Sequence, residues 1–278
     1  MDPAPATPLF YMGLNLVLAL VVSAVGFTRV VYFVSIGYAF SIVAMSLVDP
    51  ALLWGALTWV SALQCGLMLL WGLRLGVFLV RRELRPSYRA YRQSTDESTA
   101  KLSWPMRGGI WLGVSLLYAL MFSPCLFVLL SGAGASTSTV TATVSELVGL
   151  GLMAGGLLLE TVADGQKSAF KTRAPDRFCD TGLYRWVRCP NYLGEITFWV
   201  GAWVVALGVY GPAWQWIASL TGLVVLVMIM LSSARRLETT QGERYGELPE
   251  YQEYVRTVPV LLPFVPLYTL KRLPLELR

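Results

Sequence analysis

The sequence contains no histidine, and this absence excludes several common kinds of site. No imidazole can serve as a catalytic base or as a zinc ligand in this chain. Cysteine is also scarce: the four cysteines are Cys65, Cys125, Cys179 and Cys189. No two of them form a CxxC pair, so the sequence predicts neither a disulfide framework nor a structural zinc site. We therefore expect no metal in this protein.

Charged side chains are few as well. They make up 14% of the 278 residues, whereas a soluble domain carries about 25%. Hydrophobic residues make up 55%, and the mean hydropathy is +0.58. Most of the surface therefore does not face water, and we predict an integral, multi-pass membrane protein surrounded by membrane lipid. The net charge of +5 gives no reason to expect a nucleic-acid partner.

Long apolar segments indicate the fold class. A helix needs roughly 20 residues to cross about 30 Å of hydrocarbon. The sequence predicts an all-α fold with seven transmembrane helices in a single membrane domain, residues 1–278. No internal repeat is visible, so a transporter built from inverted halves has no support. The predicted spans lie near residues 9–27, 30–48, 52–80, 109–131, 147–163, 192–209 and 213–231.

Lysine and arginine indicate the orientation. The basic segments are 81–108, 161–191 and the tail after residue 231, with seven, six and seven basic residues. The connections without any basic residue are 49–51, 132–146 and 210–212. Because basic loops stay in the cytosol, we predict that the N-terminus lies outside and the C-terminus lies in the cytosol. This pattern suits the endoplasmic reticulum and a bacterial inner membrane equally.

A row of charged residues follows the fifth predicted span, in "LLLETVADGQKSAFKT". Glu160, Asp164, Lys167 and Lys171 lie on one face if the helix continues. One interpretation is a solvated helix end with internal salt bridges. The other is the wall of a polar ligand site at the membrane surface, in which lysines suit phosphate and carboxylates suit ribose hydroxyls.

The stretch "YRWVRCPNYLGE" leads into the sixth predicted span. Pro190 is typical of a first helical turn, and Glu195 lies one turn further inside. An ionisable residue costs about 2.5–3.5 kcal/mol at the bilayer centre, so it normally faces a partner or a wet cavity. Glu195 could instead pair with Arg188 or Arg185 as a simple anchor. The Asn191 amide both donates and accepts hydrogen bonds, which suits recognition of an amide or a hydroxyl.

Few hydrogen-bonding side chains occur within the early spans. Arg74 lies two helical turns inside Arg81, where a guanidinium either snorkels to the interface or points to a cavity or a carboxylate. The others are Tyr32, Tyr38 and Gln64. Taken singly, each of these three is more typical of helix packing than of catalysis.

Three motifs resemble a known family. "DGQKSAFKTRAPDRFCDTGLYRWVRCPNYLGEITFWVGAW" resembles the C-terminal signature of the steroid 5α-reductase superfamily, and its small bacterial, plant and protist branch in particular. "WGLRLGVFLVRR" is similar to the third-span motif of that branch, and "GERYGELPEYQEYVRTVPVLLP" to its terminal motif. The resemblance covers roughly residues 60–265 and is specific in 161–205.

This resemblance implies a seven-helix membrane reductase that holds NADPH at the cytosolic ends of its C-terminal helices. Hydride would pass to a carbon–carbon double bond conjugated with a carbonyl, in a steroid-like or other lipophilic substrate. Residues 1–135 would then form the substrate side, and residues 147–265 the cofactor side. The implied cofactor-binding residues are Asp164, Lys171, Arg188, Asn191, Tyr192, Glu195, Arg235 and Arg236.

Catalysis would also need a donor for the substrate oxygen, because negative charge develops there as hydride adds. Among the candidates in the early spans, we predict Tyr38 and Arg74 as catalytic residues. Two departures from the family pattern stand out. Cys189 replaces the usual histidine of "RHPNY", and the acidic and tyrosine pair that polarises the ketone in the steroid enzymes has no clear match.

Two other functions are compatible with parts of this pattern. A membrane S-adenosylmethionine-dependent methyltransferase of the isoprenylcysteine or phospholipid type shares an "R-H-P-x-Y" segment and a carboxylate on the following helix. A sterol- or lipid-binding membrane protein could keep the fold without the chemistry. The "NYLGE" motif and the upstream "Q-K-x-x-F-K" run favour the reductase over the methyltransferase.

Overall fold

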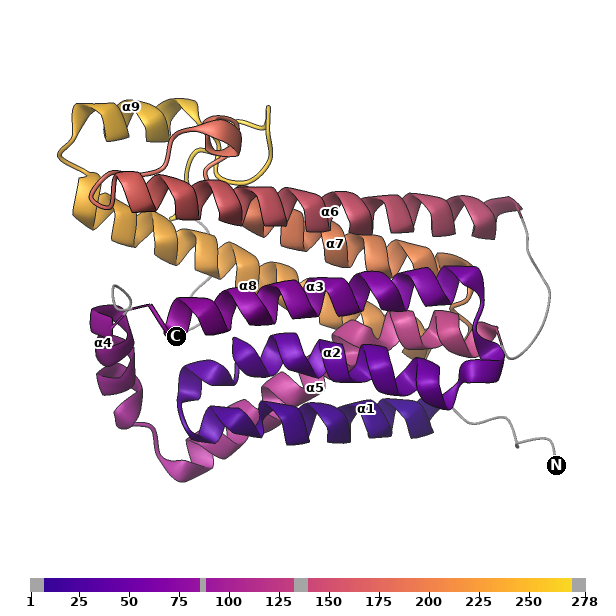
Figure 1. Cartoon of the computed structure of the whole chain (residues 1–278). Coiled ribbons are helices and arrows are strands. Elements are labelled where there is room, and N and C mark those ends of the chain that lie inside the picture. Colours follow the sequence, from indigo (N-terminus) through magenta and orange to yellow (C-terminus); the bar gives the residue numbers. More distant parts are fainter. Residues whose placement is uncertain (1–7, 86–88, 133–139, 272–278) are drawn as a thin grey trace. The chain divides into compact units, whose positions relative to one another are not determined.

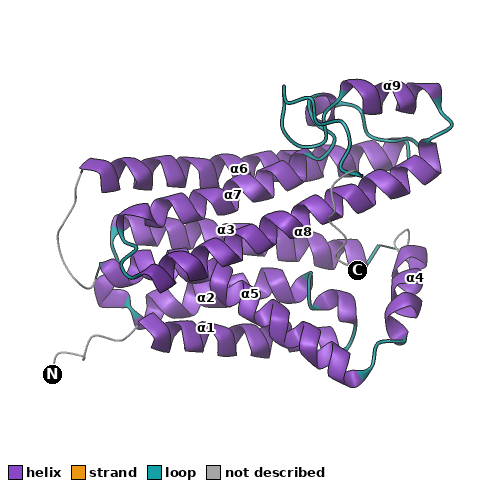
Figure 2. Cartoon of the chain, turned by 180° about the vertical axis from the view of Figure 1, so that it is seen from behind, coloured by secondary structure: helices purple, strands orange, loops and turns teal. Residues whose placement is uncertain are grey.

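A computed structural model describes residues 8–85, 89–132 and 140–271 of the chain. Figures 1 and 2 show helices joined by turns and loops, and no strand occurs in these ranges. The predicted all-α class is therefore confirmed for the part of the chain that the structure describes. The helices are α1 (Pro8–Ser23), α2 (Ile36–Leu52), α3 (Trp59–Glu83), α4 (Arg89–Ala100), α5 (Trp104–Ser131), α6 (Val140–Arg173), α7 (Pro190–Val205), α8 (Ala213–Tyr245) and α9 (Pro249–Thr257).

Among the described residues, six helical segments are long and apolar enough to cross a membrane, which supports an integral multi-pass protein. These segments are Pro8–Phe27, Val30–Leu52, Trp59–Glu83, Trp104–Ser131, Thr143–Arg173 and Ala213–Tyr245. Each overlaps one of the predicted spans. The remaining predicted span, 192–209, corresponds to α7, which has only 16 residues. The seven-span count and the orientation stay predictions.

The turn between the second and third spans was predicted at residues 49–51, and that prediction is wrong. Helix α2 continues through Asp49 and Pro50 to Leu52. Pro50 lacks the N–H that would bond the Ser46 carbonyl oxygen, and the helix ends two residues later. The turn instead precedes Thr58, which caps α3: its hydroxyl accepts from the Ser61 main-chain N–H at 3.2 Å.

The basic-free connection predicted at 132–146 is described only in part. Helix α6 already begins at Val140, so the second half of this segment is helical. Residues 133–139 lie outside the described residues.

The chain divides into two compact units. Unit 1 consists of Met1–Leu150 and Ala202–Gly222, and unit 2 consists of Gly151–Gly201 and Leu223–Arg278. Tyr38 and Arg74 belong to unit 1, whereas the eight predicted cofactor-binding residues belong to unit 2.

Close backbone packing holds the first helices of unit 1 together, and Figure 1 shows α1, α2 and α3 side by side. A methyl group at Gly72 of α3 would lie 2.9 Å from the Ala39 carbonyl oxygen of α2. One turn later, a methyl group at Gly76 would meet the Phe40 ring at 2.9 Å. Two glycines four residues apart therefore let α3 approach α2 closely, as small residues do between membrane helices.

Candidate functional site

Two glycines bring α6 and α7 into backbone contact in unit 2. A methyl group at Gly156 would lie 2.5 Å from the Phe198 main-chain nitrogen. A methyl group at Gly194 would lie 2.7 Å from the Glu160 main-chain nitrogen. Only hydrogen fits at both positions. Because higher numbers on α6 pair with lower numbers on α7, the two helices run antiparallel.

This crossing determines which turns of α6 and α7 lie next to each other, and these turns carry polar residues. Glu160 and Glu195 lie at the crossing and are buried, with 3% and 8% of their surface exposed. One turn further along α6 comes Asp164, and the matching turn back along α7 reaches Asn191. Both are partly buried. The structure therefore brings Asp164, Asn191 and Glu195 to neighbouring turns of two packed helices.

Tyr192 belongs to the same group. Its phenol lies within electrostatic range of Asp164 on α6, of Glu195 on α7 and of Arg236 on α8. Arg236 is exposed and Arg235 is partly buried. They directly follow Ala234, the α8 residue that packs against Cys189 just before α7. We name the set Asp164, Asn191, Tyr192, Glu195, Arg235 and Arg236 the polar cluster.

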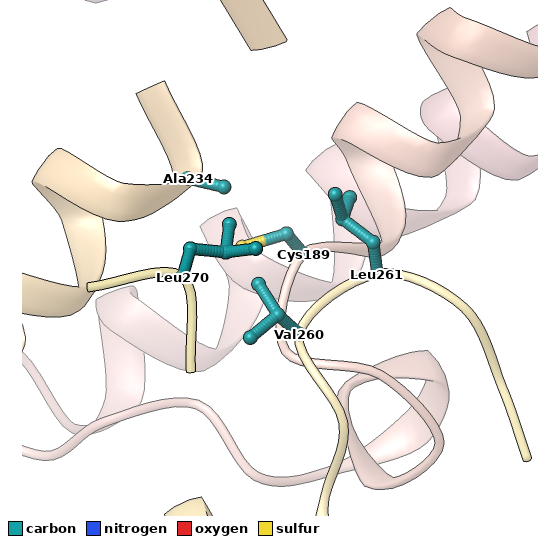
Figure 3. Packing of buried hydrophobic residues seen from close by; sticks show 5 residues of the cluster. All are labelled: Cys189, Ala234, Val260, Leu261 and Leu270. Atoms are coloured by element: carbon teal, nitrogen blue, oxygen red, sulfur yellow. The ribbon is translucent and has the colours of Figure 1, made fainter. Parts of the chain in front are cut away.

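Cys189 lies just before α7 and is packed as a small apolar residue. Figure 3 shows its side chain among Ala234 of α8 and Val260, Leu261 and Leu270 of the C-terminal segment. Burial raises the pKa of its thiol to about 11, so the thiol stays protonated at neutral pH. The position that carries histidine in the resembling family is thus part of a hydrophobic core in this chain.

Arg188 is held by the protein itself. Its guanidinium forms an ion pair with Glu238 of α8 at 3.7 Å, and it also donates to the Tyr268 carbonyl oxygen. Its main-chain N–H donates to the Pro259 carbonyl oxygen at 2.9 Å. Glu238 accepts a second hydrogen bond, from the Leu270 N–H at 3.0 Å. Arg188 therefore anchors the C-terminal segment, and its role as a cofactor ligand stays a prediction.

Lys171 is engaged in a similar way near the end of α6. Its ammonium donates to the Tyr245 hydroxyl at 3.0 Å and to the carbonyl oxygens of Pro175 and Arg177. These three bonds equal the three donors that a lysine has. Lys167, one turn earlier, lies within electrostatic range of Cys189 and of Cys179. Lys171 is therefore already engaged by the protein, and its role as a cofactor ligand stays a prediction.

Gln166 fixes the turn that precedes α7, a role that the sequence pattern did not reveal. Its amide oxygen accepts from the Leu183 main-chain N–H at 2.8 Å. Gly182 adopts a left-handed conformation with φ +62°, and a methyl group there would lie 2.4 Å from the same amide oxygen. The glutamine of the "Q-K-x-x-F-K" run and the glycine of the "TGL" turn thus form one structural device.

The residues after this turn are held by α9. The Tyr254 hydroxyl donates to the Tyr184 carbonyl oxygen at 2.8 Å. The centroid of the Phe178 ring lies 5.1 Å from that of Tyr251 and 5.2 Å from that of Tyr254. Burial raises the pKa of the Tyr184 phenol, and the negative charge of Asp164 raises it further. The tyrosines of the terminal motif therefore act as packing groups around the loop that leads to α7.

In unit 1, one of the two predicted catalytic residues, Tyr38, packs against a buried tryptophan. The Tyr38 ring is 5.0 Å from the fully buried Trp71 ring and 5.1 Å from the Tyr118 ring. Arg74 comes three residues after Trp71, on the same face of α3, and is partly buried. Unit 1 therefore places Tyr38 in a cluster of three aromatic rings, and Arg74 about one helical turn after Trp71 along α3.

The two other donors that the sequence offered have structural partners. Gln64 donates to the Ala202 carbonyl oxygen at 3.2 Å. The Tyr32 hydroxyl accepts from Arg29 at 2.8 Å and donates to Glu83 at 3.3 Å. Arg29 also contacts the Asp96 carboxylate at 2.8 Å, so this network ties α3 to α4. The catalytic roles of Tyr38 and Arg74 stay predictions.

Comparison with known proteins adds the family. No curated protein and no solved structure matches the chain. A family model described as "Protein of unknown function (DUF1295)" matches residues 20–258, a range that includes every predicted site residue. This protein therefore belongs to the DUF1295 family.

Proposed function

We propose that this protein is an NADPH-dependent membrane reductase that delivers hydride to a conjugated carbon–carbon double bond of a lipophilic, steroid-like substrate. The observation that carries the proposal is the glycine crossing of α6 and α7, which holds two buried glutamates, Glu160 and Glu195, beside Asp164 and Asn191. The resemblance of residues 161–205 to the steroid 5α-reductase superfamily supports the same function.

The proposed topology has seven spans, with the N-terminus outside and the C-terminus in the cytosol. The membrane would be that of the endoplasmic reticulum or a bacterial inner membrane. The 16 residues of α7 continue into the three residues of a 3₁₀ turn, Ala206–Gly208. Together these 19 residues reach about 28 Å, close to the hydrocarbon thickness. In this arrangement the polar cluster and all the basic segments face the cytosol, where a charged dinucleotide is available.

The donor set of unit 2 fits NADPH in its chemistry. Asp164 and Glu195 are carboxylates that suit ribose hydroxyls, and the Asn191 amide suits the nicotinamide carboxamide. Lys167 and Arg236 supply positive charge for the phosphates, together with Arg235. NADPH supplies the hydride when it is bound. Arg188 and Lys171 support this site by holding the loop and the tail around it.

On the substrate side, the proposed task of Tyr38 and Arg74 is to donate hydrogen bonds to the substrate carbonyl oxygen. A preorganised donor is worth most in a site that excludes water, where charge develops on that oxygen. The tight packing of Tyr38 against Trp71 and Tyr118 restricts the phenol to a narrow range of positions. Tyr38→Phe should therefore lower the turnover rate more than it weakens substrate binding.

The test measures thermal unfolding of the purified, detergent-solubilised protein with NADPH, NADH or S-adenosylmethionine. A ligand that binds only the folded state at 100 times its Kd stabilises it by about 2.7 kcal/mol. NADPH should raise the melting temperature, and Asn191→Ala or Glu195→Gln should abolish that rise. Glu250→Gln, a change at an exposed carboxylate of α9, is the matched control and should keep it.

Turnover is then measured as NADPH consumption with steroid enones and other lipophilic enones. Stabilisation by S-adenosylmethionine alone would refute the reductase and support a methyltransferase. Stabilisation by NADPH without oxidation of the cofactor by any enone would support a non-catalytic lipid-binding protein.

A further inference from the structure

Two buried thiols lie side by side in unit 1. The Cys65 sulfur of α3 and the Cys125 sulfur of α5 are 3.5 Å apart. Their exposed fractions are 4% and 0%. Sulfur atoms in a disulfide are about 2.05 Å apart, so these two would have to approach each other by about 1.5 Å to form a bond.

A buried acid–amide pair contains the carboxylate that acts electrostatically on one of these thiols. Asn15 of α1 donates to the Asp49 carboxylate of α2 at 2.8 Å, and both residues are fully buried. Asp49 is within electrostatic range of Cys125. Its second carboxylate oxygen has no hydrogen-bond partner among the described residues. A carboxyl group with a spare oxygen can exchange a proton with a neighbouring thiol.

Both cysteines lie near the basic-free ends of their helices. Cys65 is six residues after the start of α3 at Trp59, and Cys125 is six residues before the end of α5 at Ser131. Each is therefore about 9 Å from its helix end. The adjoining connections carry no lysine or arginine. In the predicted orientation these helix ends therefore lie on the side opposite the cytosol, and disulfides persist on that side.

We propose that Cys65 and Cys125 form an oxidisable dithiol that a membrane-dissolved quinone converts into a disulfide between α3 and α5. Two S–H bonds break and one S–S bond forms, and the quinone takes up both electrons and both protons to become a quinol. The spare oxygen of Asp49 relays the proton that leaves Cys125. Protein atoms cover both sulfurs, so oxidation requires a local opening between α3 and α5, and a lipid-soluble oxidant can reach that opening from the membrane because both helices are apolar spans. The proposal does not depend on the reductase activity.

The experiment uses the full chain in proteoliposomes, first reduced and then freed of reductant. A ubiquinone analogue with a fully substituted ring is added, so that thiols cannot add to the ring. After denaturation, free thiols are labelled with a maleimide and counted by mass spectrometry. We expect four labelled cysteines before quinone and two afterwards, with Cys65 and Cys125 joined in one peptide and both recovered by reductant. Four labels after quinone, or loss at other cysteines, would overturn the proposal.

Variants separate this pair from the other two thiols. The Cys179→Ser protein should carry three labels before quinone and one afterwards. The Cys65→Ser protein should carry three labels before and after quinone. The count on the unsubstituted chain decides the matter even where a variant fails to fold. Asp49→Asn keeps the pairing with Asn15 possible and should slow disulfide formation at least about tenfold. An unchanged rate in that variant would remove Asp49 from the reaction, and equally fast oxidation by a membrane-impermeant disulfide would remove the quinone.

Discussion

Arg188 and Glu238 form a buried ion pair, with 3.7 Å between the guanidinium nitrogen and the carboxylate oxygen. The pair joins the start of α7 to α8, and the Leu270 N–H attaches the C-terminal segment to the same carboxylate. Their side chains are only 4% and 10% exposed, so water screens the pair little. The entry to α7, the arginine-bearing part of α8 and the tail are therefore fixed together by one acidic residue.

Removal of that acid should destabilise unit 2. Breaking a buried pair from one side leaves an uncompensated charge, which costs about 3–5 kcal/mol. We expect Glu238→Ala to lower the free energy of unfolding by this amount in a denaturant titration. Arg244→Ala, which breaks the exposed Arg244–Asp176 pair at 2.8 Å, is the control and should cost less than about 1 kcal/mol. Equal losses in the two variants would show that the buried pair adds nothing.

The glycine crossing predicts opposite effects at two adjacent residues of α6. A methyl group at Gly156 would lie 2.5 Å from a main-chain nitrogen of α7, so Gly156→Ala must push the helices apart and should cost about 1–3 kcal/mol. At Gly155 nothing lies within 4 Å of the new methyl group. Gly155→Ala should therefore be neutral or stabilise the helix by up to about 1 kcal/mol.

The same two variants test the site. If the polar cluster binds NADPH, Gly156→Ala should also weaken the NADPH-dependent rise in melting temperature, because it displaces Glu195 from Asp164. Gly155→Ala should leave that rise intact. A Gly156→Ala protein with an unchanged response to NADPH would separate the crossing from the cofactor site.

Because its thiol is buried, Cys189 should make the free energy of unfolding fall at alkaline pH. Its pKa is raised from 9.0 to about 11 by burial, so the folded state holds the thiol proton where the unfolded chain releases it. Stability from this group is complete below pH 9 and falls as the pH rises towards 11. Two pKa units correspond to about 2.7 kcal/mol as an upper value. Cys189→Ala should show a correspondingly smaller loss between pH 9 and 11, and parallel curves for the two proteins would contradict this.

Local pattern was sufficient for some features of this molecule and not for others. The charged face that contains Glu160 and Asp164 follows from helical spacing, because α6 continues without a break to Arg173. The end of α2 differs from the prediction because the helix continues past Pro50 for two more residues, to Leu52. The partners of Arg188 and Lys171 could not be foreseen, since Glu238 and Tyr245 come from a distant helix. The sequence of a motif identifies its basic residues. Only the tertiary structure shows whether each basic side chain is already bound by another group of the protein.

Gln166 and Gly182 should be energetically coupled. Gly182→Ala is expected to cost more than the 1–2 kcal/mol of a left-handed alanine, because its methyl group would also lie 2.4 Å from the Gln166 amide oxygen. Gln166→Ala alone loses the hydrogen bond to the Leu183 N–H and should cost about 1 kcal/mol. In the double variant the steric conflict is gone, so the two losses should sum to more than the measured total. A double-mutant cycle on the free energy of unfolding measures this difference, and strict additivity would show that the glutamine does not hold the turn.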